Sequence, residues 1–118
     1  MSDSLMIRAR LIYLLSKWQR RELSTEKVHA EAESLFRDFV CDEVPRSEPK
    51  SILNEVLIQL DILNHQLIIE EDIPAILKFL QTPPTALESG WQIWEAYWNS
   101  IDFQDRRQRL ANNPYYAV

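Results

Sequence analysis

Apolar residues recur along this chain at helical spacing, and polar, proline-containing segments separate one stretch from the next. Two start signals are clear: Ser24 or Thr25 can cap a helix, and so can Asp102. Asp72 or Glu71 is expected to cap another helix, which the Thr82-Pro83-Pro84 stretch ends. The pattern predicts six helices, over about residues 4–20, 25–40, 50–65, 72–81, 86–100 and 102–111.

The third of these stretches carries the widest apolar face, with Ile58 and Ile62 extending a stripe of Ile, Leu and Val residues. A helix that is apolar over so much of its circumference is expected at the centre of a fold. The run Leu67–Ile69 is interpreted as a buried connector, because no second strand is available to pair with it. On the second stretch, His29 is predicted on the outer face, beside Glu26 and Glu33.

Composition supports the same architecture. The chain has 118 residues and a single glycine, Gly90, whereas hairpins and sheet turns commonly require glycine. A length of 118 residues is typical of one domain with a normal core. We therefore expect an all-α fold, a compact single-domain bundle of five to six helices spanning residues 1–118.

The chain resembles neither a secreted nor a membrane protein. Its first residues lack the ordered regions of a signal peptide, and no apolar run approaches the length of a membrane span. The single cysteine, Cys41, excludes an intramolecular disulfide. The acidic balance, a net charge of −5, disfavours nucleic acid as a partner. We expect a cytoplasmic protein with no nucleic-acid or membrane partner, and leave its oligomeric state open.

Acidic residues are concentrated in one part of the chain. Residues 22–77 hold 13 carboxylates against 4 basic residues, a net charge of −9. Such a stretch can form a solvated face that keeps a small protein soluble, or a docking surface for a basic protein. The second helix and the following loop (41–49) supply the predicted partner-binding residues: Glu31, Glu33, Asp38, Asp42, Glu43 and Glu48.

The C-terminal third offers an alternative surface, because it is rich in aromatic residues. Three tryptophans at positions i, i+3 and i+7 of one helix are more often core than ligand platform. Arginines at 106, 107 and 109 could stack on this cluster. The alternative partner-binding residues are Trp91, Trp94, Trp98, Tyr115 and Tyr116.

No catalytic set is recognisable. Cys41 lies beside two carboxylates, which raise the pKa of a thiol and make it a poor nucleophile. Glu26 and His29 match one Glu-x-x-His unit of di-iron bundles, and Asp61 with His65 could add two ligands. Because the other half of such a site is missing, we predict no metal, no cofactor and no enzymatic activity.

Two stretches resemble known proteins. Residues 11–35 (LIYLLSKWQRRELSTEKVHAEAESL) are similar to the start of colicin-D-type immunity proteins, small helical bacterial inhibitors that bind a basic nuclease toxin through an acidic face. Asp72-Ile73-Pro74, with the ending from Tyr97 to Ala117, is similar to a group of uncharacterised short bacterial proteins. Together they cover about half the chain. The aromatic C-terminal third departs from the immunity proteins, so no family binding residues are carried over.

These observations favour a non-enzymatic protein-binding module. Its most concrete form is an immunity-type inhibitor that covers a basic toxin or nuclease with an acidic face. The alternative is an adaptor or regulatory subunit that binds a partner through its Trp/Tyr-rich C-terminal region.

Overall fold

The computed structural model describes residues 2–39 and 44–116, and within them the chain is helical, with no strand. The prediction of an all-α fold with six helices is confirmed. Two short 3-10 helices, η1 and η2, precede two of the α-helices. The elements are α1 (Ser2–Gln19), α2 (Thr25–Asp38), α3 (Lys50–Asp61), η1 (Glu70–Asp72), α4 (Ile73–Leu80), η2 (Pro84–Ala86), α5 (Leu87–Asn99) and α6 (Phe103–Arg109).

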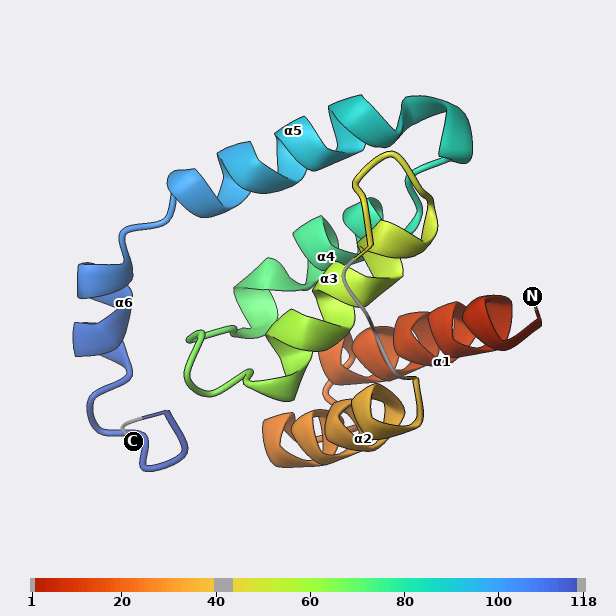
Figure 1. Cartoon of the computed structure of the whole chain (residues 1–118). Helices are drawn as coiled ribbons and strands as arrows, with labels where there is room; N and C mark the ends of the chain where they lie inside the picture. Colours follow the sequence, from red (N-terminus) through yellow and green to blue (C-terminus); the bar gives the residue numbers. More distant parts are fainter. Residues whose placement is uncertain (1, 40–43, 117–118) are drawn as a thin grey trace.

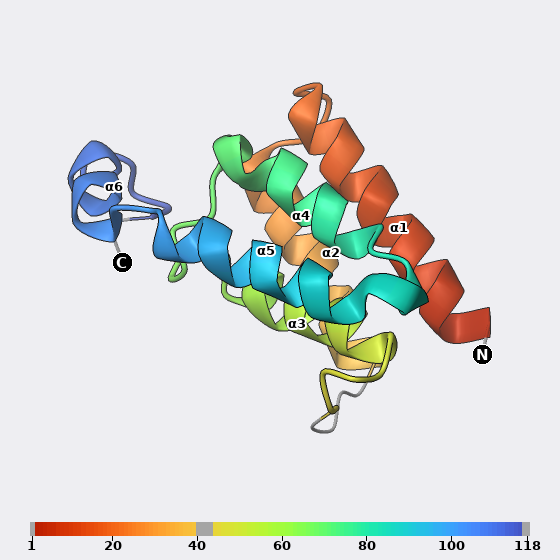
Figure 2. The ribbon, with the colours of Figure 1, turned by 90° about the horizontal axis from the view of Figure 1, so that it is seen from above.

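The helices form three tiers (Figure 1), with α5 on one side, α3 and α4 in the middle, and α1 and α2 on the other side. Seen from above, α5 runs across α3 and α4, and α6 lies beyond its end (Figure 2). Seven of the twelve residues of α3 are buried, which confirms its central position in the fold. The predicted extension of its apolar stripe is wrong, because Ile58 and Ile62 are 39% and 36% exposed. The radius of gyration of 14.1 Å is close to that of a compact domain of this length, about 13.5 Å.

Two of the predicted helix starts are confirmed by their caps. The Ser24 hydroxyl accepts a hydrogen bond from the Lys27 N–H (3.1 Å), and the Asp102 carboxylate accepts one from the Asp105 N–H (3.0 Å). These bonds satisfy N–H groups that have no partner inside the helix. Within the described part of the chain, no helix combines the length and the apolar character needed to cross a bilayer.

The third helix is shorter than predicted. It ends at Asp61, and the following residues form turns in which Leu67 has a positive φ of 55°. This turn places Leu67 and Ile68 in the core, 6% and 1% exposed, whereas a helix continued to His65 would carry them past it. The interpretation of this run as a buried connector is therefore correct, and the predicted end of the helix is wrong.

Asp72 occupies the predicted N-cap position of α4, but its carboxylate has another role. Its side chain is fully buried and makes no capping bond to α4. Instead, its two oxygens accept hydrogen bonds from Arg106 of α6, at 2.8 and 3.1 Å. The Ile69 N–H (2.9 Å) and the Tyr97 hydroxyl also donate to this carboxylate. A buried carboxylate needs such partners, because an unpaired charge in the interior is costly.

The C-terminal tail lies against the middle of the chain. Tyr116 is buried, and its hydroxyl donates to the carbonyl oxygen of Ile68 (2.6 Å). The Tyr115 hydroxyl donates to Nδ1 of His29. These two bonds, together with the Asp72–Arg106 pair, attach α6 and the tail to the bundle.

We expect the Gly90→Ala substitution to destabilise the fold, although alanine is the better helix former by about 1 kcal/mol. A Cβ on Gly90 would lie 2.5 Å from Thr82 Cγ2 and 2.7 Å from its Oγ1, so the helix and the 82–84 connection would have to separate. The expected loss of unfolding free energy is about 1–3 kcal/mol, measured by urea denaturation. In a Thr82→Ala background the same substitution should be neutral or stabilising. A higher urea midpoint for Gly90→Ala alone would contradict this explanation.

Candidate functional site

The predicted acidic residues are distributed around α2 and the segment after it. Asp38 and Glu48 are exposed, and Glu31 and Glu33 are half-buried. Asp42 and Glu43 lie outside the described residues. Glu31 and Glu33 are two positions apart on a helix, so their side chains leave it in directions about 200° apart. The four described residues therefore do not share one face of α2.

Glu31 differs from the other three because it is already paired. Its carboxylate lies 3.4 Å from Arg10 of α1 and 3.4 Å from Lys27 of α2. The hydrogen bond from Arg10, assisted by Lys27, holds the pKa of Glu31 below its usual value. Its negative charge is largely compensated within the protein.

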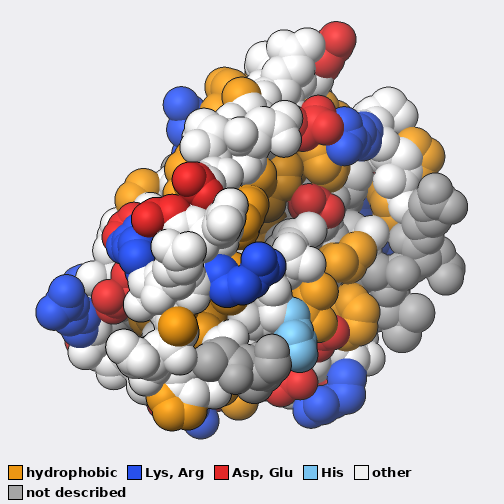
Figure 3. Space-filling view, turned by 90° about the vertical axis from the view of Figure 1, so that its left-hand side faces the viewer, with side chains coloured by type: hydrophobic (Ala, Val, Ile, Leu, Met, Phe, Trp, Pro, Cys, Tyr) orange, Lys and Arg blue, Asp and Glu red, His pale blue; other side chains and the backbone are white. Residues whose placement is uncertain are grey.

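The other three described acidic residues of the predicted set, Glu33, Asp38 and Glu48, carry uncompensated charge. Within residues 2–39 and 44–116, no ion pair involves Glu33, Asp38 or Glu48. Glu26, seven positions before Glu33, lies on the same side of α2. Burial, with the charges of Glu26 and Glu33, raises the pKa of Tyr115. The face at the α6 end, in contrast, shows acidic and basic side chains interspersed with apolar ones (Figure 3).

The prediction that His29 lies on the outer face of α2 is wrong. His29 is 9% exposed, and both of its ring nitrogens are occupied. The carbonyl oxygen of Asp61 can only accept, so Nε2 donates to it (2.7 Å) and Nδ1 accepts from Tyr115. Both ring nitrogens of His29, the atoms that could ligate a metal, are engaged in hydrogen bonds within the protein. Nowhere in the described part of the chain do three His, Cys, Asp or Glu side chains gather as a metal site would require.

The predicted aromatic residues lie mostly in the core. Trp91, Trp94 and Tyr116 are only 7%, 4% and 7% exposed. The Trp91 indole N–H donates to Ser51 of α3 (3.2 Å), and that of Trp94 donates to Glu55 (3.0 Å). Only Trp98 and Tyr115 of the predicted set are half-buried. The adaptor hypothesis stays a prediction, and most of the area assigned to it packs inside the protein.

The arginine that stacks on the tryptophans is not one of the three expected, although Arg106 lies 5.7 Å from the centre of the neighbouring Phe103 ring. Arg46, from the segment before α3, lies 4.3 Å from the centre of the Trp91 ring and 3.0 Å from Glu95. Arg106 is buried against Asp72, and Arg109 is paired with Glu71 at 2.7 Å. A stacking partner so distant in sequence cannot be read from local spacing.

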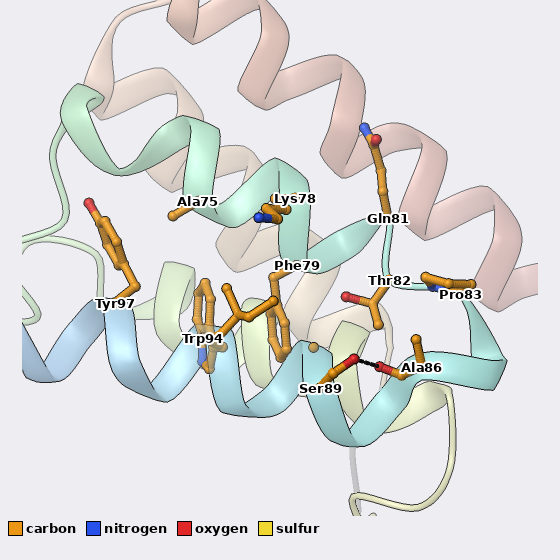
Figure 4. Close-up of a pocket in the computed structure, with 12 residues that line it drawn as sticks. Ala75, Lys78, Phe79, Gln81, Thr82, Pro83, Ala86, Ser89, Trp94 and Tyr97 are labelled. Carbon is orange, nitrogen blue, oxygen red and sulfur yellow. Dashed lines mark hydrogen bonds between the residues drawn. The ribbon is translucent and has the colours of Figure 1, made fainter.

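One surface was not predicted from the sequence. A groove of about 510 Å³ runs between α4 and α5. Phe79 and Trp94 lie stacked between these helices, 4.2 Å apart at their ring centres (Figure 4). Ile93 borders the groove and is 49% exposed. The sequence held one signal of this groove: Ile93 lies off the aromatic stripe of α5, on the same side as Gly90 and Ala86.

No protein-family model, curated protein or solved structure matches this chain. The resemblance to immunity proteins therefore stays a prediction, and the argument about function rests on the residues themselves.

We expect the stability of the fold to fall as the pH rises from 10 to 12, because of Tyr97. Burial and the hydrogen bond to Asp72 raise its pKa to about 12, from about 10 in an unfolded chain. The folded state holds this proton more tightly, so the stabilisation is complete below pH 10 and is lost above it. Urea midpoints measured across this range should fall less steeply for Tyr97→Phe.

Tyr116 also has a raised pKa, so part of the pH dependence should remain in that variant. The control is Tyr13→Phe, at an exposed position of α1. An unchanged slope in Tyr97→Phe would contradict the assignment.

Proposed function

We propose that this protein is a non-enzymatic binding protein that takes up a basic protein partner on the acidic surface of α2 and the segment before α3. The support is electrostatic. Residues 22–77 carry a net charge of −9, and this surface lies within them. An acidic surface attracts a cationic partner over distances of about 8 Å at physiological salt, and it affects association rate and specificity more than final affinity.

The observation that carries the proposal is the contrast between paired and unpaired carboxylates. Glu31 is held by two cations, whereas Glu33, Asp38 and Glu48 have no ion pair within the described residues. A carboxylate without a partner loses no internal bond when a cationic side chain of another protein approaches it. The surface is therefore free to form new ion pairs at little cost to the fold.

The most concrete form of this proposal is an immunity-type inhibitor. A nuclease holds its substrate through clustered Lys and Arg side chains, and a protein surface rich in carboxylates can occupy that cluster in place of phosphates. The similarity of residues 11–35 to the start of such inhibitors falls on α1 and α2, the two helices joined by the Arg10–Glu31 pair. No chemistry by this chain is required.

The test is a charge reversal on α2 and the segment after it. We expect Glu33→Lys, Asp38→Lys and Glu48→Lys, combined, to weaken partner binding by about tenfold or more and to flatten its dependence on salt. The partner is first captured from native lysate, eluted by rising salt and identified by mass spectrometry. Affinity is then measured with the purified pair at several salt concentrations.

The matched control reverses two carboxylates elsewhere that have no ion pair within the described residues, Glu88→Lys and Asp105→Lys. It is compared with the double variant Asp38→Lys and Glu48→Lys, which produces the same change in net charge. We expect the control variant to keep most of the affinity, because its substitutions lie away from α2. Equal losses in the two double variants would mean that net charge alone drives binding. An unchanged affinity in the triple variant would reject the proposal.

A further inference from the structure

The groove between α4 and α5 has the form of a site for a helix. Its walls are two helices, and small exposed or half-buried residues line it: Ala75 on α4, with Ala86 and Ser89 along η2 and α5. Gly90 also lines it but is buried against Thr82. Small side chains allow another backbone to approach closely. Ile93 supplies the large exposed apolar side chain of the lining. The stacked pair of Phe79 and Trp94 also lines the groove but is almost fully buried (Figure 4). A hydrophobic groove of this kind takes up the apolar face of an amphipathic helix.

The apolar surface continues beyond the groove. Thr82 also lines a second hollow, of about 530 Å³, between the first turns of α1 and α3 and the 82–84 connection. Leu5, which is 67% exposed, borders this hollow. Each hollow thus has one strongly exposed apolar side chain, Ile93 in the groove and Leu5 in the second hollow, and the two hollows meet at Thr82. Apolar area gathered in this way marks interaction sites more often than scattered exposed residues do.

The charges on this surface have the opposite sign to the net charge of the protein. Lys78 is the one charged residue among the described lining of the groove, and Arg8 and Lys50 are the charged ones in the second hollow. No described lining residue is a carboxylate, in a chain with a net charge of −5. Lys78 is exposed and forms no ion pair with any residue that the structure describes. The surface is apolar with a cationic rim.

We infer that the α4–α5 groove binds an amphipathic helix of a partner protein, one whose apolar face is flanked by Asp and Glu residues. The apolar face fills the groove, and a flanking carboxylate pairs with Lys78. This site is independent of the proposed acidic surface, because α5 and α2 lie on opposite sides of α3 and α4 (Figure 1). The two surfaces select partners of opposite charge.

The test is a peptide-display selection on the immobilised full-length protein. The library consists of helix-forming peptides with apolar residues fixed at i, i+3, i+4 and i+7 and with randomised flanking positions. We expect enrichment of Asp and Glu at those flanks. For the enriched peptide, Ile93→Glu should weaken binding by about tenfold or more, and Lys78→Glu by about two- to fivefold.

Two matched controls separate the groove from general effects of charge. Gln92→Glu places the same carboxylate on the exposed residue directly before Ile93 in α5. Arg107→Glu reverses an exposed cation on α6. Both should leave peptide affinity unchanged. Failure to enrich any helix, enrichment of Lys or Arg at the flanks, or equal binding by Ile93→Glu would overturn the inference. One further result would also overturn it: the protein binds no peptide but self-associates, and Ile93→Glu abolishes the self-association. The occupant of the groove would then be a second copy of the chain.

Discussion

Replacing Arg106 with Met is expected to cost about 3–5 kcal/mol of unfolding free energy, a large share of the total for a domain of this size. The Arg106 side chain is 4% exposed, and that of Asp72 is fully buried. The substitution removes both bonds from the guanidinium and leaves the carboxylate in the interior with the Ile69 N–H and the Tyr97 hydroxyl as donors. Arg106 also donates to the carbonyl oxygen of Leu67 (3.1 Å), which would lose this partner. Urea denaturation followed by circular dichroism measures the loss.

The chain contains a matched control for this prediction. Arg109, one turn along the same helix, pairs with Glu71 at 2.7 Å, but both side chains are at least half exposed. Arg109→Met should cost less than about 1 kcal/mol, because water screens and replaces an exposed ion pair. The double variant Asp72→Leu with Arg106→Met should be more stable than Arg106→Met alone, since no buried charge remains. Equal costs for the two arginines would contradict the importance assigned to burial.

The second large effect is expected for Trp94→Ala, about 3–5 kcal/mol. Trp94 is 4% exposed, stacks on Phe79 and donates its indole N–H to Glu55. Removing the ring leaves a cavity beside α3 and removes the partner of Phe79. The neighbouring Ile93→Ala removes an apolar side chain that is half exposed, and should cost no more than about 0.5 kcal/mol. Similar costs at the two positions would mean that α5 is not seated on the core as described.

This stability difference determines how the C-terminal aromatic residues can be tested for partner binding. A loss of binding in Trp94→Ala cannot be distinguished from a loss of folding. Trp98 and Tyr115, which are half-buried, are the members of the predicted set whose substitution reports on the surface. Thermal unfolding of each variant, measured before any binding assay, identifies the substitutions that leave the fold intact.

The sequence predicted the helices well where one local rule decides the outcome. The predicted helix over residues 4–20 is present as α1, and its apolar residues at helical spacing lie on one face: Leu11, Leu14, Leu15 and Trp18 are at most 1% exposed and Ile7 is half-buried. The caps at Ser24 and Asp102 depend on residues within one turn. The end of α3 depends instead on where Leu67 and Ile68 must go, which is a property of the assembled core. The pattern of apolar residues near position 61 does not contain information about the assembled core, so it could not predict where α3 ends.

The candidate sites show the same division. The surplus of carboxylates in residues 22–77 is a property of composition and could be counted from the sequence. Which of them are ion-paired could not be predicted, because the pairing of Glu31 depends on Arg10 of another helix. His29 looked like a surface residue because its partners, Tyr115 and Asp61, are 86 and 32 positions away. The α4–α5 groove forms between two helices, so the signal within α5, Ile93 and Gly90 off the aromatic stripe, could not by itself show that a groove exists.

The bonds that hold the C-terminal tail have a consequence for the order of folding. Tyr116 and Ile68 are 48 positions apart, and Tyr115 and His29 are 86 apart, whereas most contacts in a helical bundle are local. Closing such long segments costs chain entropy before any contact compensates for it. The helices of the three tiers, α1 to α5, can therefore assemble first, with α6 and the tail docking in a late step. The contacts of the tail should therefore be unformed in the folding transition state, and weakening them should raise the unfolding rate more than it lowers the folding rate.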